Sequence, residues 1–147
     1  MAWLLRFDGL YEPRGRPDGV ATYGFVVERD GARVHEESGV ALGPGEGGSA
    51  HVAELAALIH GLAWLLDHKR DQEPLRVEGD SRLAIETVAG RWRLASARLV
   101  PLRDSAQRLL RELACDATLV KISRDANARP DALARAAYHA WKRAKLA

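Results

Sequence analysis

The sequence predicts an α/β fold in which a five-stranded mixed β-sheet is flanked by helices. Three observations lead to this prediction. Short segments rich in apolar and β-branched residues, separated by turn signals, fill the first part of the chain and follow one another directly, as antiparallel strands do. Leucine and alanine then recur at helical spacing over longer segments. Two further strand-like segments alternate with these helices, which is typical of parallel strands.

We expect the first three strands at residues 2–8, 20–28 and 33–42. The Pro- and Gly-rich stretch from Glu12 to Gly19 predicts the first turn. Asp30-Gly31 is a sequence typical of a tight hairpin. The three strands should therefore form an antiparallel meander.

Ser49 is a candidate N-cap for the long helix that follows the meander. The apolar stripe of this helix consists of Leu55, Leu58, Ile59, Leu62, Leu65 and Leu66. We expect further strands at residues 75–79 and 116–122, and further helices at residues 81–89, 101–113 and about 131–145. The carboxyl ends of the first, fourth and fifth strands can then lie side by side, where open α/β sheets bind their ligands.

A chain of 147 residues, 47% of them hydrophobic, is expected to form a single domain over residues 1–147. No apolar run reaches the roughly 20 residues that span a bilayer, so we expect no membrane partner. Cys115 is the single cysteine, which excludes an internal disulfide and fits a reduced thiol in the cytoplasm.

The net charge of +2 is small, but the basic residues are unevenly distributed. The segment 91–111 holds six arginines and one acid, Asp104, and the tail holds Lys142, Arg143 and Lys145. Such stretches fit a polyanionic partner, and each also fits a solvated helix face.

Four carboxylates on separate segments are the main candidates for a functional site: Asp8, Glu54, Asp80 and Asp131. Taken singly, each has an ordinary explanation. Asp8 fits a turn residue and Glu54 a solvated helix residue. Asp80 fits a helix cap and Asp131 a favourable acid at a helix start. Carboxylates that converge repel one another unless cations lie between them. Oxygen ligands without a His/Cys cluster suit Mg²⁺ or Mn²⁺. Two such ions, about 3.5–4 Å apart, are a recurring device for cleaving phosphodiesters.

These four motifs, from Phe7-Asp8-Gly9 to Asp131-Ala132-Leu133-Ala134, make the chain resemble a type 1 ribonuclease H. The resemblance covers essentially the whole chain and is greatest to the compact archaeal and bacterial members. It implies the ribonuclease H-like fold, with the four acids as catalytic ligands of two Mg²⁺ or Mn²⁺ ions. It also implies hydrolysis of the RNA strand of RNA–DNA hybrids to 5′-phosphate and 3′-hydroxyl ends, largely independent of sequence because backbone contacts carry little base information.

The loop before the last helix departs from the family pattern. Many relatives carry a histidine there, whereas residues 123–130 contain none and Asp125 is a candidate replacement. Arg124 matches an arginine of compact relatives and is expected to assist at the scissile phosphate; the alternative is a surface arginine. Asn127, Gly9 and Ser81 are expected to contact the substrate.

Ser49-Ala50-His51 stands where relatives often carry Thr-Asn-Asn. Ser49 keeps a hydroxyl for a phosphate, Ala50 lacks an amide, and His51 is either a substrate contact or an exposed side chain. Trp92, between two arginines, suits duplex contact, and packing over a helix end is the alternative. The chain lacks a separate hybrid-binding domain and most of the basic handle of larger relatives, so we expect modest, salt-sensitive hybrid affinity.

Three other functions stay open from the sequence. The first is a broader nuclease that also cuts double-stranded RNA. The second is a catalytically silent nucleic-acid-binding module, and the third is a structural domain whose acids bind no metal. We expect a monomer in each case.

Overall fold

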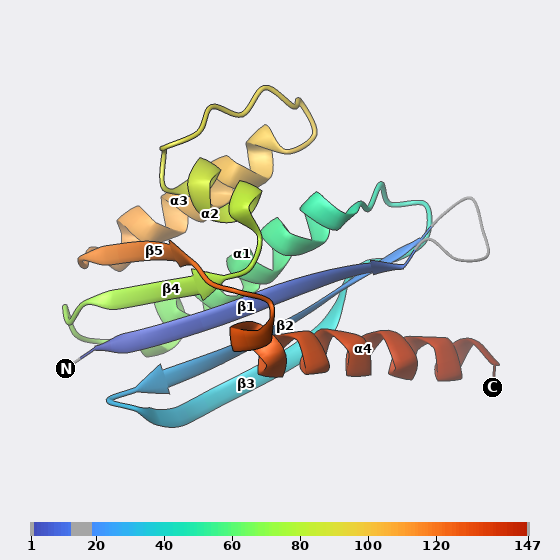
Figure 1. The fold of residues 1–147 in the computed structure, drawn as a ribbon, viewed down its shortest axis with the longest axis horizontal. Helices are drawn as coiled ribbons and strands as arrows, with labels where there is room; N and C mark the ends of the chain where they lie inside the picture. The colour runs from blue at the N-terminus through green and yellow to red at the C-terminus, as the bar shows by residue number, and fades with distance from the viewer. Residues whose placement is uncertain (1, 13–18, 147) are drawn as a thin grey trace.

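The computed structural model describes residues 2–12 and 19–146, which form a five-stranded sheet in the order β3-β2-β1-β4-β5 with helices packed on it (Figure 1). The strands are β1 (Trp3–Glu12), β2 (Val20–Arg29), β3 (Ala32–Leu42), β4 (Leu75–Gly79) and β5 (Ala117–Lys121). The helices are α1 (Ala50–His68), α2 (Arg82–Val88), α3 (Val100–Leu113) and α4 (Ala128–Leu146), with a short 3₁₀ turn, η1 (Asp125–Asn127). The predicted mixed α/β fold is confirmed.

The strand directions follow from the connections. β1, β2 and β3 pair antiparallel, whereas β4 pairs in parallel with β1, and β5 pairs in parallel with β4. Asp30 and Gly31 join β2 to β3 with φ angles of 54° and 82°. Positive φ at both positions is what a tight hairpin turn matching the strand twist requires, so the hairpin signal in the sequence is confirmed.

β1 is longer than the sequence predicted. Its pairing with β4 ends at Phe7 and Gly79, but its pairing with β2 continues to Glu12 and Val20. Asp8 therefore lies within a strand and does not end it, contrary to the prediction. The predicted turn from Glu12 to Gly19 is wrong at Glu12, and residues 13–18 lie outside the described part of the chain.

Helices cover both faces of the sheet. Figure 1 shows α4 crossing β2 and β3 on one face, while α1 lies across the other face and packs against α3. Leu55, Leu58, Leu62 and Leu65 of α1 are fully buried, as the helical stripe predicted. By length and composition α1 is apolar enough to cross a membrane, with a mean hydropathy of 1.2, but in this fold it is the central core helix.

The last helix begins at Ala128, earlier than the predicted Asp131. Pro130 stands in the first turn of the helix, where its missing N–H has no intrahelical partner to lose. β5 is shorter than predicted by one residue at each end. These shifts move Asp131 from the start of α4 into its first turn.

Gly24 of β2 lets α4 lie unusually close to the sheet. A Cβ atom at this position would stand 2.5 Å from the Pro130 carbonyl oxygen and 2.7 Å from the Leu133 Cβ. Thr22, on the same face of β2, donates a hydrogen bond of 2.8 Å to the Ala134 carbonyl. Residue type at Gly24 thus sets the distance between α4 and β2.

Gly24→Ala should destabilise the protein by about 1–3 kcal/mol, because a buried backbone must move to admit one methyl group. Urea denaturation checks this. Gly43→Ala is the matched control, since its Cβ would meet only the end of the Glu46 side chain, at 3.4 Å. The control should change stability by less than about 0.5 kcal/mol. A Gly24→Ala protein as stable as the wild type would contradict the close packing of α4.

Candidate functional site

Three carboxylates from three different elements converge beside the carboxyl end of β4. Asp8 lies in β1, Glu54 in α1, and Asp80 directly after β4. Each offers an oxygen atom, and these atoms all lie within 4.8 Å of one another. Asp8 is buried, with 5% of its surface exposed, so its carboxylate has little access to water that could offset the charge. The adjacency of β1 and β4 that was expected to bring Asp8 and Asp80 together is therefore present.

The position of Glu54 depends on Gly9. A Cβ atom on Gly9 would lie 2.2 Å from the carbonyl carbon of Ala53, so only glycine allows α1 this close to β1. The Gly9 amide donates a hydrogen bond of 2.9 Å to Glu54 Oε1. Gly9, expected at the substrate, thus also positions a carboxylate.

The edge of β1 that faces β4 is open beyond Phe7. The bond from Trp3 N to Pro74 O, 3.0 Å, shows that odd-numbered residues of β1 point their backbone groups toward β4. Because β4 ends at Gly79, the Gly9 amide has no strand partner there. The Glu54 carboxylate takes the place of that partner.

Asn127 fills the neighbouring position on this edge. Its Nδ2 donates a hydrogen bond of 2.8 Å to the Phe7 carbonyl, and the residue is fully buried. Its Oδ1 is the one buried side-chain atom without a hydrogen-bond partner among the described residues. Asn127 was expected at the substrate, but in this structure its amide ties the loop before α4 to β1.

Burial and mutual repulsion change the protonation of the cluster. Burial, followed by the charge of Asp80 and a hydrogen bond with Asp131, raises the pKa of Asp8 from 3.8 to about 8. Burial, followed by the charges of Asp8 and Asp80, raises the pKa of Glu54 from 4.5 to about 9. Without a cation, the cluster therefore retains protons at higher pH than isolated carboxyl groups would.

The fourth expected acid, Asp131, lies beside the other three but is not among the three oxygens within 4.8 Å of one another. Its side chain is near enough to Asp8 to help raise the pKa of that carboxyl, and it accepts a bond of 3.0 Å from Arg135 Nε, one helical turn further along α4. The sequence analysis missed Arg135, although the spacing of four residues is a recognisable signal for such a pair.

The donor set fits a divalent cation. The converging ligand atoms are all carboxylate oxygens, which suit hard cations, and the raised pKa values show that the site lacks compensating positive charge. Asp8, Glu54 and Asp80 are the residues that would hold such a cation. Asp131 stands at the border of this group, where Arg135 binds it.

Two serines expected at the substrate cap helices. Ser49 accepts a hydrogen bond of 3.1 Å from Val52 N at the start of α1, as predicted. Ser81 accepts one of 3.2 Å from Ala84 N at the start of α2, so the alternative that Asp80 caps this helix is wrong.

The remaining expected residues lie on the surface. His51, Trp92, Arg124 and Asp125 are exposed, with 47% of the Trp92 surface accessible. About half of the Trp92 surface is therefore open to solvent, just after the end of α2. Arg124 precedes the η1 turn and makes no side-chain cap to it.

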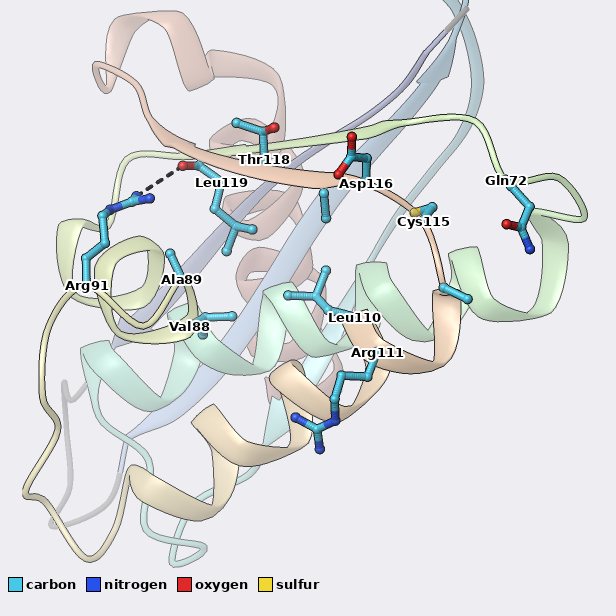
Figure 2. Close-up of a pocket in the computed structure, with 12 residues that line it drawn as sticks. Gln72, Val88, Ala89, Arg91, Leu110, Arg111, Cys115, Asp116, Thr118 and Leu119 are labelled. Carbon is cyan, nitrogen blue, oxygen red and sulfur yellow. Dashed lines mark hydrogen bonds between the residues drawn. The ribbon is translucent and has the colours of Figure 1, made fainter.

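A cavity of about 740 Å³ lies away from the carboxylates, between β5 and helices α2 and α3 (Figure 2). Arg91 donates a hydrogen bond of 3.2 Å to the Leu119 carbonyl at its rim, drawn as the dashed line. None of the four acids lines it, so this cavity and the carboxylate cluster are separate features.

Solved structures resemble this chain over nearly its full length. The N-terminal RNase H domain of a Mycobacterium tuberculosis protein is 25% identical, with a TM-score of 0.84 and 98% of each chain covered. RNase H1 from Halobacterium salinarum is 28% identical, with a TM-score of 0.82, covering 95% of this chain and 98% of that one. LC11-RNase H1 from compost, solved in complex with an RNA/DNA hybrid, is 26% identical, with a TM-score of 0.79, covering 92% and 95%.

A family model described as reverse transcriptase-like matches residues 14–137. The chain is an RNase HI-like member of this family. This RNase HI-like protein is accordingly a nuclease of the ribonuclease H type, and its cluster of acids is consistent with divalent metal binding.

Without divalent cations, the melting temperature of the RNase HI-like protein should fall by several degrees as pH rises from about 5 to about 9. In the folded state the pKa values of Asp8 and Glu54 are raised, whereas in the unfolded chain these groups ionise near their ordinary values. Rising pH therefore favours unfolding throughout this window. Added Mg²⁺ should raise the melting temperature more at a pH of about 8.5 than at about 6, because cation binding requires ionised carboxylates.

Thermal melts with EDTA and with Mg²⁺ check both effects. Asp80→Asn should make the pH dependence shallower, since Asp80 helps to raise both pKa values. Asp104→Asn is the control, because Asp104 is exposed on α3, is paired with its neighbour Arg103 and does not belong to the carboxylate cluster. A melting temperature that is flat across this pH range would contradict the raised pKa values.

Proposed function

We propose that this RNase HI-like protein hydrolyses the RNA strand of RNA–DNA hybrids with two divalent cations, Mg²⁺ or Mn²⁺, leaving 5′-phosphate and 3′-hydroxyl ends. The observation that carries this proposal is the convergence of Asp8, Glu54 and Asp80 within 4.8 Å. The RNA/DNA hybrid bound by LC11-RNase H1, 26% identical to this chain, supports the same substrate class here.

The cation-binding residues are Asp8, Glu54, Asp80 and, after release from Arg135, Asp131. Bound divalent cations supply Lewis acidity that lowers the pKa of a water and stabilises the leaving 3′ oxygen. The protein contributes a fixed frame for this chemistry. The Gly9 amide orients one Glu54 oxygen, and Asp8 is held within β1 by its pairing with Gly24 of β2. Ordering the ligands before the substrate binds lowers the reorganisation that the reaction requires.

Ser49, Trp92 and Arg124 are the proposed substrate contacts. The Ser49 hydroxyl accepts a bond from Val52 N, so its own hydrogen remains available to donate to a phosphate. The exposed Trp92 ring offers a flat apolar surface, and the exposed Arg124 side chain is long enough to bring positive charge to the scissile phosphate. These contacts address the backbone, which predicts cleavage that is largely independent of sequence.

We further propose that residues 1–147 act as one catalytic domain and work as a monomer in the cytoplasm. The match covers 98% of the Halobacterium RNase H1 chain, which supports a catalytic unit of this size.

Cleavage of an end-labelled RNA–DNA hybrid in Mg²⁺ tests the function directly. We expect the wild type to cut only the RNA strand, and EDTA to abolish cutting. Asp80→Asn should lower the rate by at least about a hundredfold. Losing a residue that only hydrogen-bonds to a metal ligand already costs about 10- to 100-fold, and losing the ligand itself costs more. Asp104→Asn should cut at the wild-type rate.

Two parallel substrates separate the proposal from its alternatives. Equal cutting of double-stranded RNA would show a broader nuclease. Binding of the hybrid without cutting in Mg²⁺ or Mn²⁺ would show a silent binding module. Circular dichroism of Asp80→Asn must match the wild type for its inactivity to count.

A further inference from the structure

The loop between β3 and α1, residues 43–48, has little structure of its own. Four of its six residues are glycine, and Gly45 and Gly47 adopt φ angles of 80° and 83°. Among the described residues, its internal hydrogen bonds join only Gly43 and Glu46. Such a loop is held in one conformation only by contacts from outside it.

Arg98 supplies that contact from the segment between α2 and α3. Its Nη2 donates to the Glu46 carbonyl at 2.8 Å and to the Gly47 carbonyl at 2.6 Å, and its Nε donates to the Gly47 carbonyl at 3.1 Å. One guanidinium thus binds two successive carbonyls across about 50 residues of sequence. The planar guanidinium of arginine carries several N–H donors in a fixed arrangement, which suits it to binding two carbonyls at once. A lysine ammonium lacks this fixed arrangement.

Both partners are shaped for this contact. A Cβ atom on Gly47 would lie 2.3 Å from Arg98 Nη2, so a side chain at Gly47 would displace the guanidinium. On the other side, Leu99 N and Val100 N donate to the Ser96 carbonyl at 3.1 and 3.0 Å, and the Leu99 side chain is buried. Arg98 therefore projects from a turn that backbone hydrogen bonds and the buried Leu99 side chain hold in place.

The fixed carbonyls lie just before Ser49. Ser49 caps α1 two residues after Gly47, and its hydroxyl is a substrate donor in the proposed function. Because two backbone steps separate them, a loop free at Gly47 would let this hydroxyl move. The carboxylates are held independently, through Gly9 and Gly24.

We propose that Arg98 is a positioning residue for substrate binding, which holds the loop 43–48 so that the Ser49 hydroxyl meets a backbone phosphate. This rests on the proposed function. Loss of the contact should weaken hybrid binding and raise KM while leaving kcat nearly unchanged, because the groups that hold the cations do not move.

The test compares Arg98→Ala and Arg98→Lys with Arg108→Ala. Arg108 is an exposed arginine on α3 that contacts Glu112 and not the loop, so its loss removes the same charge. Hybrid affinity is measured by fluorescence anisotropy in the Asp80→Asn background, and KM and kcat in the otherwise wild-type protein. Amide hydrogen exchange of residues 43–48 is measured without substrate.

Arg98→Ala should weaken hybrid binding and raise KM by roughly three- to tenfold, the range expected when an ordinary solvent-exposed hydrogen bond is lost. It should also speed exchange in the loop, while Arg98→Lys shows a smaller effect and Arg108→Ala none. Gly47→Ala should weaken binding at least as much as Arg98→Ala, because it removes the same contact and also places a side chain at a φ angle of 83°. The double variant should be no worse than Gly47→Ala alone.

Equal weakening by Arg108→Ala would overturn the proposal in favour of a general charge effect. Weaker binding by Arg98→Ala with unchanged loop exchange would overturn it in favour of direct substrate contact by Arg98. Hybrid binding and KM unchanged in Arg98→Ala would overturn the positioning role alone, whereas a wild type that neither binds nor cuts the hybrid would overturn the proposed function with it.

Discussion

The site depends on how closely two helices can approach β1 and β2 from opposite faces. Gly9 admits α1 on one face, and Gly24, the register partner of Asp8 on β2, admits α4 on the other. A methyl group at either position would meet helix backbone at 2.2–2.5 Å. Without both approaches, Glu54 and Asp131 could not reach Asp8. The carboxylate cluster is thus a consequence of backbone packing before it is one of charge.

That packing forces like charges together, and the protein does not neutralise them with its own cations. Arg135 binds Asp131, at the border of the cluster, but no basic side chain in the described ranges binds Asp8, Glu54 or Asp80. Elsewhere the chain pairs its acids readily: Glu78, for example, is held by Arg6 and Arg76 and its pKa is lowered. Because the cluster has no such pairing, the metal-free protein is stable only while these acids hold protons. Its stability falls as rising pH ionises them.

The sequence predicted the parts of the fold that depend on local signals. Asp30-Gly31 fixes a hairpin, Ser49 caps α1, and the leucine stripe of α1 finds its core. It failed where an element depends on a partner elsewhere in the chain: β1 continues past Asp8 because β2 does, and Asn127 is buried because β1 offers it a free carbonyl. The proximity of Asp8 and Asp80 could be anticipated from strand adjacency, and Glu54 from the family resemblance. The glycine contacts could not, since glycine near a carboxylate also occurs in ordinary turns.

The difference in length between β1 and β4 has a consequence for the shape of the sheet. β4 ends at Gly79, whereas β1 continues to Glu12, so the last part of β1 has no strand beside it on this edge. There the side chains of Glu54 and Asn127 make hydrogen bonds to the β1 backbone. A side chain can release a backbone group and return to it, whereas a neighbouring strand cannot do so residue by residue. If β4 were a few residues longer, regular pairing would occupy this edge and close the gap. The early end of one short strand is therefore what leaves an opening for chemistry in an otherwise continuous sheet.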